Sequence, residues 1–237
     1  MISVLLSTVA FLVADSAPAA AAPAAPPPVA VEKTTVAAPA PVLAANVSTP
    51  ATAPVFAGLS DQAVADEVLR YLQGISTLKG DFVQTAPSGA VATGDFHLRR
   101  PGQIRFDYDA PSPVTIVATQ GMVYVENADL ETTDSYPLKK TPLRFLLDKK
   151  IDIGDAVLKS VDRDQRSVAV TYASTDEETE GEITLILAAP ALAIEQWAVR
   201  DAQGGVTVVS LQGVTAGASI DNRLFRAPDA GGAFINK

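Results

Sequence analysis

Apolar and polar residues alternate with a period of two through most of the chain after residue 77. The clearest case is the run 94–108, which is divided by the pair Pro101-Gly102. Its apolar positions are Phe96, Leu98, Ile104, Phe106 and Tyr108. Alternation on both sides of a tight turn predicts an antiparallel hairpin with one apolar face.

Two adjacent arginines, Arg99 and Arg100, stand at the end of this hairpin. The alternating pattern does not require a cation at either position. An apolar sheet face with a cation at its mouth is suited to holding an apolar ligand, so the hairpin is the first candidate site.

The same alternation predicts further strands before and after the hairpin, joined mostly by short links. Leu78, Gly80, Phe82 and Gln84 share one face of the strand that precedes it. Short links predict antiparallel neighbours. The other expected strands are 114–118, 122–127, 131–136, 157–162, 167–173, 182–187, 193–200 and 206–214.

Two segments have helical spacing instead. Ser60 is a good N-cap for a helix that ends at Gly74, with Val64, Val68 and Leu72 along one apolar stripe. A second, short helix is expected to start with Thr141 as N-cap and Pro142 as its first residue.

These elements together predict an α+β fold that is mainly antiparallel β. A sheet of so many strands curls into either a closed barrel or an open half-barrel. The two helices would then lie against the concave side. This arrangement forms a ligand cavity if the concave face is incompletely filled, and an ordinary core if it is filled.

Composition divides the chain into three parts. Residues 1–22 begin with a short apolar run and resemble an export signal, although no basic residue precedes Lys33. Residues 23–57 are rich in Pro and Ala and are expected to form an extended linker. Residues 58–237 are expected to form one domain.

Composition also excludes several classes of function. The chain has no cysteine and hence no disulfide, and its net charge of −9 argues against a nucleic-acid partner. The one histidine, His97, has no serine or cysteine nucleophile motif that it could activate as a base. The sequence also lacks a cluster of His, Cys or carboxylate residues at the spacing of a metal site. The acidic run 176–180 is expected to be a solvated loop. We therefore expect no enzyme, no catalytic residue, no metal and no cofactor.

Several short motifs follow one another along the chain. They are Gly80-Asp81-Phe82-Val83-Gln84, Gly94-Asp95-Phe96, Arg100-Pro101-Gly102, Arg105-Phe106-Asp107-Tyr108, Pro111, Val114–Ala118 with Gly121, Val123-Tyr124, Thr141-Pro142-Leu143 and Leu224-Phe225-Arg226-Ala227-Pro228. In their order and spacing they resemble the LolA family of periplasmic carriers of outer-membrane lipoproteins, and the resemblance runs from about residue 69 to residue 228.

The resemblance implies an unclosed half-barrel sheet covered by a helical lid, in a periplasmic protein. It implies acylated lipoproteins as cargo, an inner-membrane ABC transporter as donor and an outer-membrane lipoprotein receptor as acceptor. Having no cysteine, the chain resembles the soluble carrier and not the receptor, which is itself a lipoprotein. We expect the carrier to be a monomer.

The resemblance also assigns a role to Arg100, which would hold the lid closed by bonding to the lid region. The residues expected to line the cavity are apolar positions of the helices and strands. They are Val68, Leu72, Phe82, Phe96, Ile104, Phe106, Tyr124, Leu143 and Leu146.

Two alternatives share the same fold. The first is a lipid- or lipoprotein-sensing domain of an envelope-stress regulator. The second is a carrier of another lipid, which the sequence does not separate from a lipoprotein carrier because all acyl chains present the same methylenes.

Overall fold

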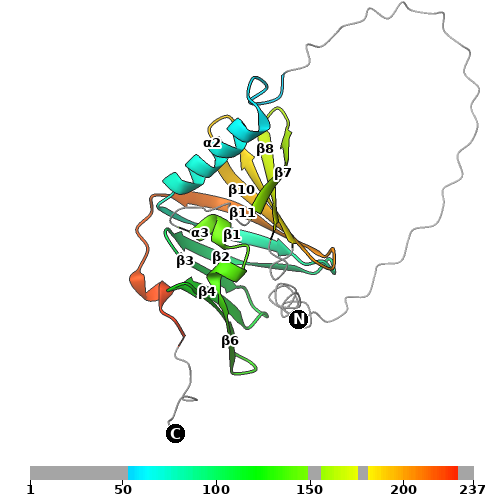
Figure 1. Ribbon diagram of the computed structural model, residues 1–237. Helices are drawn as coiled ribbons and strands as arrows, with labels where there is room; N and C mark the ends of the chain where they lie inside the picture. The colour runs from blue at the N-terminus through cyan, green and yellow to red at the C-terminus, as the bar shows by residue number, and fades with distance from the viewer. Residues whose placement is uncertain (1–52, 149–155, 176–180, 229–237) are drawn as a thin grey trace, which may run out of the picture. The chain divides into compact units, whose positions relative to one another are not determined.

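The computed structural model describes residues 53–148, 156–175 and 181–228 (Figure 1). The predicted export signal, most of the predicted linker and the acidic run 176–180 lie outside these residues. Val55 and Phe56, which fall within the predicted linker, pack against the core, and the Val55 amide donates to the Asp164 carbonyl at 2.8 Å.

The described residues form eleven strands, two α-helices and two 3₁₀ helices. They are α2 (Asp61–Gly74), β1 (Thr77–Thr85), β2 (Val91–Arg99), β3 (Gln103–Tyr108), β4 (Val114–Thr119), β5 (Met122–Asn127), β6 (Thr132–Pro137), η1 (Leu138–Lys140), α3 (Arg144–Leu147), β7 (Ala156–Arg163), β8 (Ser167–Ser174), β9 (Gly181–Ala188), β10 (Ala193–Asp201), β11 (Val206–Ala216) and η3 (Asn222–Phe225).

All strands belong to one antiparallel sheet in the order β6-β5-β4-β3-β2-β1-β11-β10-β9-β8-β7. Among the described residues the end strands β6 and β7 do not pair, so the sheet is unclosed. This confirms the predicted fold class, and the predicted strands appear within a few residues of their expected bounds.

The sheet is strongly curved. Strands β3 and β10 are four positions apart in the order, a separation of roughly 19 Å in a flat sheet. Nevertheless the rings of Phe106 on β3 and Trp197 on β10 lie 6.2 Å apart. The two halves of the sheet therefore face each other across an apolar interior, which we call the trough.

Helix α2 has the predicted bounds and cap. The Ser60 hydroxyl accepts a hydrogen bond from the Ala63 amide at 3.2 Å, and Val64, Val68 and Leu72 are buried. Its hydrophobic stripe lies against the trough.

The second helix begins later than predicted. Helix α3 starts at Arg144, and its N-cap is Leu143, which makes no side-chain capping bond. The prediction of Thr141 as N-cap is wrong, because its hydroxyl donates to the Leu138 carbonyl at 2.9 Å instead. The Thr141 side chain thus binds the preceding 3₁₀ helix, η1, and does not cap α3.

Replacing the α2 cap gives a first test of this fold. We expect Ser60→Ala to lower the free energy of unfolding by about 1 kcal/mol, since the Ala63 amide loses its acceptor. Urea denaturation measures the change. Ser135→Ala, at an exposed position on β6, is the control and should stay within about 0.5 kcal/mol of wild type. Equal stability of both variants would contradict a capping role for Ser60.

Candidate ligand-binding site

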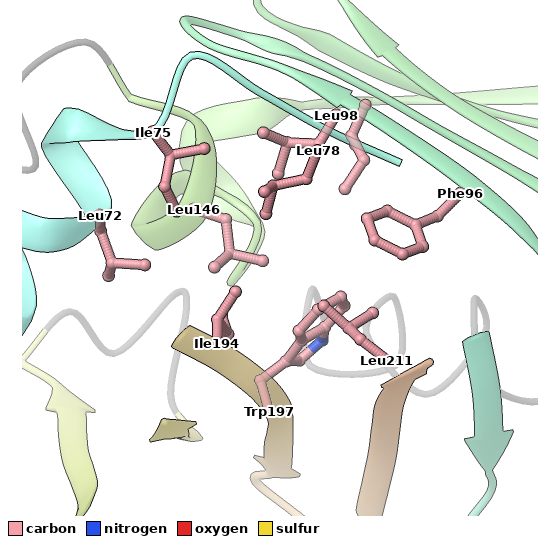
Figure 2. A pocket seen from close by; sticks show the side chains of 10 residues that line it. Leu72, Ile75, Leu78, Phe96, Leu98, Leu146, Ile194, Trp197 and Leu211 are labelled. Carbon is pink, nitrogen blue, oxygen red and sulfur yellow. The ribbon is translucent and has the colours of Figure 1, made fainter. Parts of the chain in front are cut away.

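The trough contains a small cavity with entirely apolar walls (Figure 2). Both helices and both halves of the sheet contribute to it. Its lining residues are Leu72, Ile75, Leu78, Phe96, Leu98, Ile104, Leu146, Ile194, Trp197 and Leu211.

The cavity has a volume of about 10 Å³, which is close to the space that one water molecule needs. The described residues therefore leave little free space at this point of the trough. A cavity of this size admits an acyl chain only if the residues that line it move apart.

Arg100 fastens both helices to the β2–β3 turn. Its guanidinium donates to the carbonyl of Leu72, in the last turn of α2, and to the carbonyl of Asp148, directly after α3. Carbonyls at helix ends have no partner within the helix, so they are natural acceptors for a cation. The Gly102 amide of the same turn donates to the Leu147 carbonyl at 2.8 Å. We call these contacts the latch.

The Arg100 guanidinium is half-buried. Burial lowers its pKa, and the nearby Asp148 acts in the opposite direction. The charged group is thus partly removed from water and bonded to backbone carbonyls, which makes the latch sensitive to any movement that lets water in.

Arg99, next to it, faces away from the trough. Its guanidinium lies 4.7 Å from the ring centre of Phe225 and donates to the side-chain oxygen of Asn222. Arg105 adds a bond to the Leu224 carbonyl at 3.3 Å. The two neighbouring arginines therefore hold different parts of the chain, Arg100 the helices and Arg99 the C-terminal segment.

Most of the predicted lining residues lie in or beside the cavity. Leu72, Phe96, Ile104 and Leu146 line it. Val68, Phe82 and Phe106 are buried in the surrounding core, and Leu143 is partly buried against it. The structure does not bring Tyr124 there, since it lies on the face of β5 opposite to Val123 and Val125, which are buried in the core.

Six lining residues were not among the predicted ones. Leu78 and Leu98 share a strand face with Phe82 and Phe96, so the alternation could have identified them. Ile75 follows the stripe of α2. Ile194 and Trp197 are separated by a shift of register in β10, which breaks the alternation and hides their common face. Leu211 comes from β11, which is exposed toward its end, so its two faces differ little in burial.

The described residues contain no group of three or more His, Asp or Glu side chains placed to hold a metal ion. No helix in the described ranges has the length and apolar character needed to cross a membrane. The site that the described residues form is an apolar trough with a cationic latch.

Comparison with known proteins gives a family match. Residues 73–228 match the family model described as outer membrane lipoprotein carrier protein LolA. An uncharacterized protein of Rickettsia prowazekii is 28% identical over 119 residues, which are 50% of this chain and 56% of that protein. An outer-membrane lipoprotein carrier protein of Methylococcus capsulatus is 33% identical over 81 residues, 32% of this chain and 39% of that protein. The chain thus spans about half the length, or less, of these relatives.

Two solved structures are similar to this chain at low sequence identity. A lipoprotein-sorting protein domain from Vibrio parahaemolyticus has a TM-score of 0.45 at 8% identity, covering 70% of this chain and 95% of that one. A LolA superfamily protein from Nitrosomonas europaea has a TM-score of 0.39 at 10% identity, covering 69% and 97%.

Proposed function

The chain belongs to the LolA family, and we propose that it is a soluble periplasmic carrier of acylated lipoproteins. In this proposal it accepts its cargo from an inner-membrane ABC transporter, shields the acyl chains in the trough and delivers them to an outer-membrane lipoprotein receptor. The observation that supports the proposal most directly is an apolar trough whose two covering helices share one cationic latch.

The energetics favour a trough that is closed when empty. Burial of three acyl chains of roughly fifteen methylenes would give about 36 kcal/mol at about 0.8 kcal/mol per methylene. Non-covalent complexes do not exceed about 18–21 kcal/mol. A carrier must also release its cargo, so part of the gross gain has to be offset.

The latch supplies such an offset. Loading separates Arg100 from the Leu72 and Asp148 carbonyls, and each hydrogen bond to a charged group contributes about 1.5–3 kcal/mol. The side chains that line the small cavity must also be displaced. Both contributions return when the helices close, and they favour release to the receptor.

The only tryptophan of the chain, Trp197, lines the cavity and gives a direct test. We expect a triacylated lipopeptide with brominated acyl chains to quench the fluorescence of Trp197, because bromine quenches only at short range. The same lipopeptide without acyl chains is the control and should leave the emission unchanged. Absence of quenching by the acylated lipopeptide would contradict the proposal, and quenching by brominated free lipids alone would indicate a carrier of another lipid.

A further inference from the structure

Tyr172 is a polar side chain in an apolar place. It lies on the face of β8 that carries Val168 and Val170, and only 1% of its surface is exposed. Its ring stacks on Phe145 of α3, with ring centres 5.8 Å apart and planes 13° apart. On the other face of the same strand, the Thr171 hydroxyl finds its partner in Thr184 at 2.9 Å.

The Tyr172 hydroxyl is buried and has no hydrogen-bond partner among the described residues. Two other tyrosines that pack against the core have bonded hydroxyls. The Tyr108 hydroxyl donates to the Gln84 amide oxygen at 2.7 Å, and the Tyr71 hydroxyl accepts from the Ile194 amide at 3.1 Å. An unsatisfied buried hydroxyl destabilises the folded state, and phenylalanine at the same position would avoid this cost. The hydroxyl therefore points to a partner that is present in another state of the protein.

The chemistry of this partner follows from the state of the phenol. Burial raises the pKa of Tyr172 to about 12, and the charge of Asp66 acts in the same direction. At neutral pH the group is thus an uncharged donor. Asp66 itself is exposed and accepts from the Gln62 amide at 2.9 Å, so it is engaged elsewhere. The uncharged Tyr172 hydroxyl, surrounded by apolar side chains, is suited to bind an uncharged acceptor that is attached to an apolar chain.

Helix α3 connects the hydroxyl to the cavity. The same short helix places Leu146 on the cavity wall and Phe145 on the ring of Tyr172. It is held by the latch through the Leu147 and Asp148 carbonyls. A displacement of α3 that opens the cavity also moves Phe145 off the ring of Tyr172.

We propose that, when α3 moves away, the Tyr172 hydroxyl donates a hydrogen bond to the carbonyl oxygen of an acyl ester or amide at the head of a bound chain. This inference rests on the proposed function. It adds that the trough recognises the acyl linkage and not hydrocarbon alone. Ester and amide carbonyls are strong acceptors, whereas the oxygen of an ether-linked chain is a weak one.

The test compares Tyr172→Phe with wild type for three probes. Dioleoylglycerol carries ester carbonyls, its di-O-alkyl analogue carries ether oxygens, and N-phenylnaphthylamine carries neither. We expect wild type to bind the ester about fivefold to tenfold more tightly than the ether, corresponding to the ~1–1.4 kcal/mol of one hydrogen bond. Tyr172→Phe should lose this preference and bind the dye as wild type does. An unchanged preference in Tyr172→Phe would overturn the proposal.

The matched control is Tyr108→Phe, which removes a hydroxyl that already has its partner, Gln84. We expect this variant to keep the ester preference and to lose about 2–4 °C in Tm. Ligand-free Tyr172→Phe should be at least as stable as wild type. A loss of stability like that of Tyr108→Phe would overturn the proposal, because it would show a structural partner for the Tyr172 hydroxyl.

Two further measurements distinguish a failure of the proposed function from a failure of this inference, and a protein-linked acyl chain from a free lipid. If wild type fails to bind even the dye, the proposed apolar site is wrong, whatever the role of Tyr172. A triacylated lipopeptide in place of dioleoylglycerol tests protein-linked chains against free lipid. If Tyr172→Phe binds both dioleoylglycerol and the lipopeptide more weakly than wild type, Tyr172 recognises the carbonyl that the two ligands share. If it binds only one of them more weakly, that ligand is the one that Tyr172 recognises.

Discussion

Arg100→Leu is expected to leave loading intact and to slow the release of cargo about tenfold to a hundredfold. The substitution removes both bonds that tie Leu72 and Asp148 to the hairpin turn. The closed, empty state then loses an advantage of about 1.5–3 kcal/mol, after water has replaced part of what is lost. Since the open state binds cargo, the apparent affinity rises by the same factor as the closed state weakens.

The measurement is the rate at which loaded protein transfers a lipoprotein to liposomes that carry the receptor. Arg99→Leu is the matched control, because it removes the same charge at the neighbouring position. The Arg99 side chain contacts Asn222 and Phe225, and not the helices. We expect the control to transfer at the wild-type rate. If Arg100→Leu also transfers at that rate, Arg100 does not act as a latch.

The largest effect on stability is expected from Gly94→Ala. Gly94 is buried in β2, opposite Phe82 on β1 and Tyr108 on β3. A Cβ atom at this position would lie 2.0 Å from the Asp107 carbonyl oxygen and 2.8 Å from Cε1 of Phe82. The first is a backbone atom of the neighbouring strand, so the strands themselves would have to separate.

This glycine also makes room for a cluster of aromatic rings in the core. The Phe82 ring meets Phe106 edge-on at 5.2 Å and Tyr108 edge-on at 5.0 Å. Gly94→Ala would displace Phe82 and disturb both contacts. We therefore expect a loss of about 2–4 kcal/mol in the free energy of unfolding, as overpacking in a core produces.

Urea denaturation of Gly94→Ala and Gly74→Ala tests this expectation. A Cβ atom on Gly74, in the last turn of α2, meets nothing within 4 Å. Alanine also has the higher helix propensity, so Gly74→Ala should match or slightly exceed wild type in stability. Similar urea midpoints of unfolding for the two variants would contradict the expectation. They would show that the strands around Gly94 can move to accommodate a Cβ atom at little cost in stability.

The sequence by itself determined the elements and much of their order. Period-two alternation identified the strands, the Ser60 cap and Gly74 set the ends of α2, and short links required antiparallel neighbours. These features depend on residues close together in the chain, so local patterns suffice to predict them. Arg100 was also identified as a contact of the lid, through resemblance to a family and not through its local pattern.

Only the tertiary structure decided what the trough contains. A register shift in β10 places Ile194 and Trp197 on one wall, and alternation puts Tyr124 on the other face of its strand. Whether the interior is hollow or filled depends on how side chains from strands and helices far apart in sequence meet. Where the described residues line the cavity, they leave about 10 Å³. The unpartnered hydroxyl of Tyr172 is decided in the same way. Whether a buried donor finds an acceptor depends on the three-dimensional neighbourhood, which no local pattern specifies.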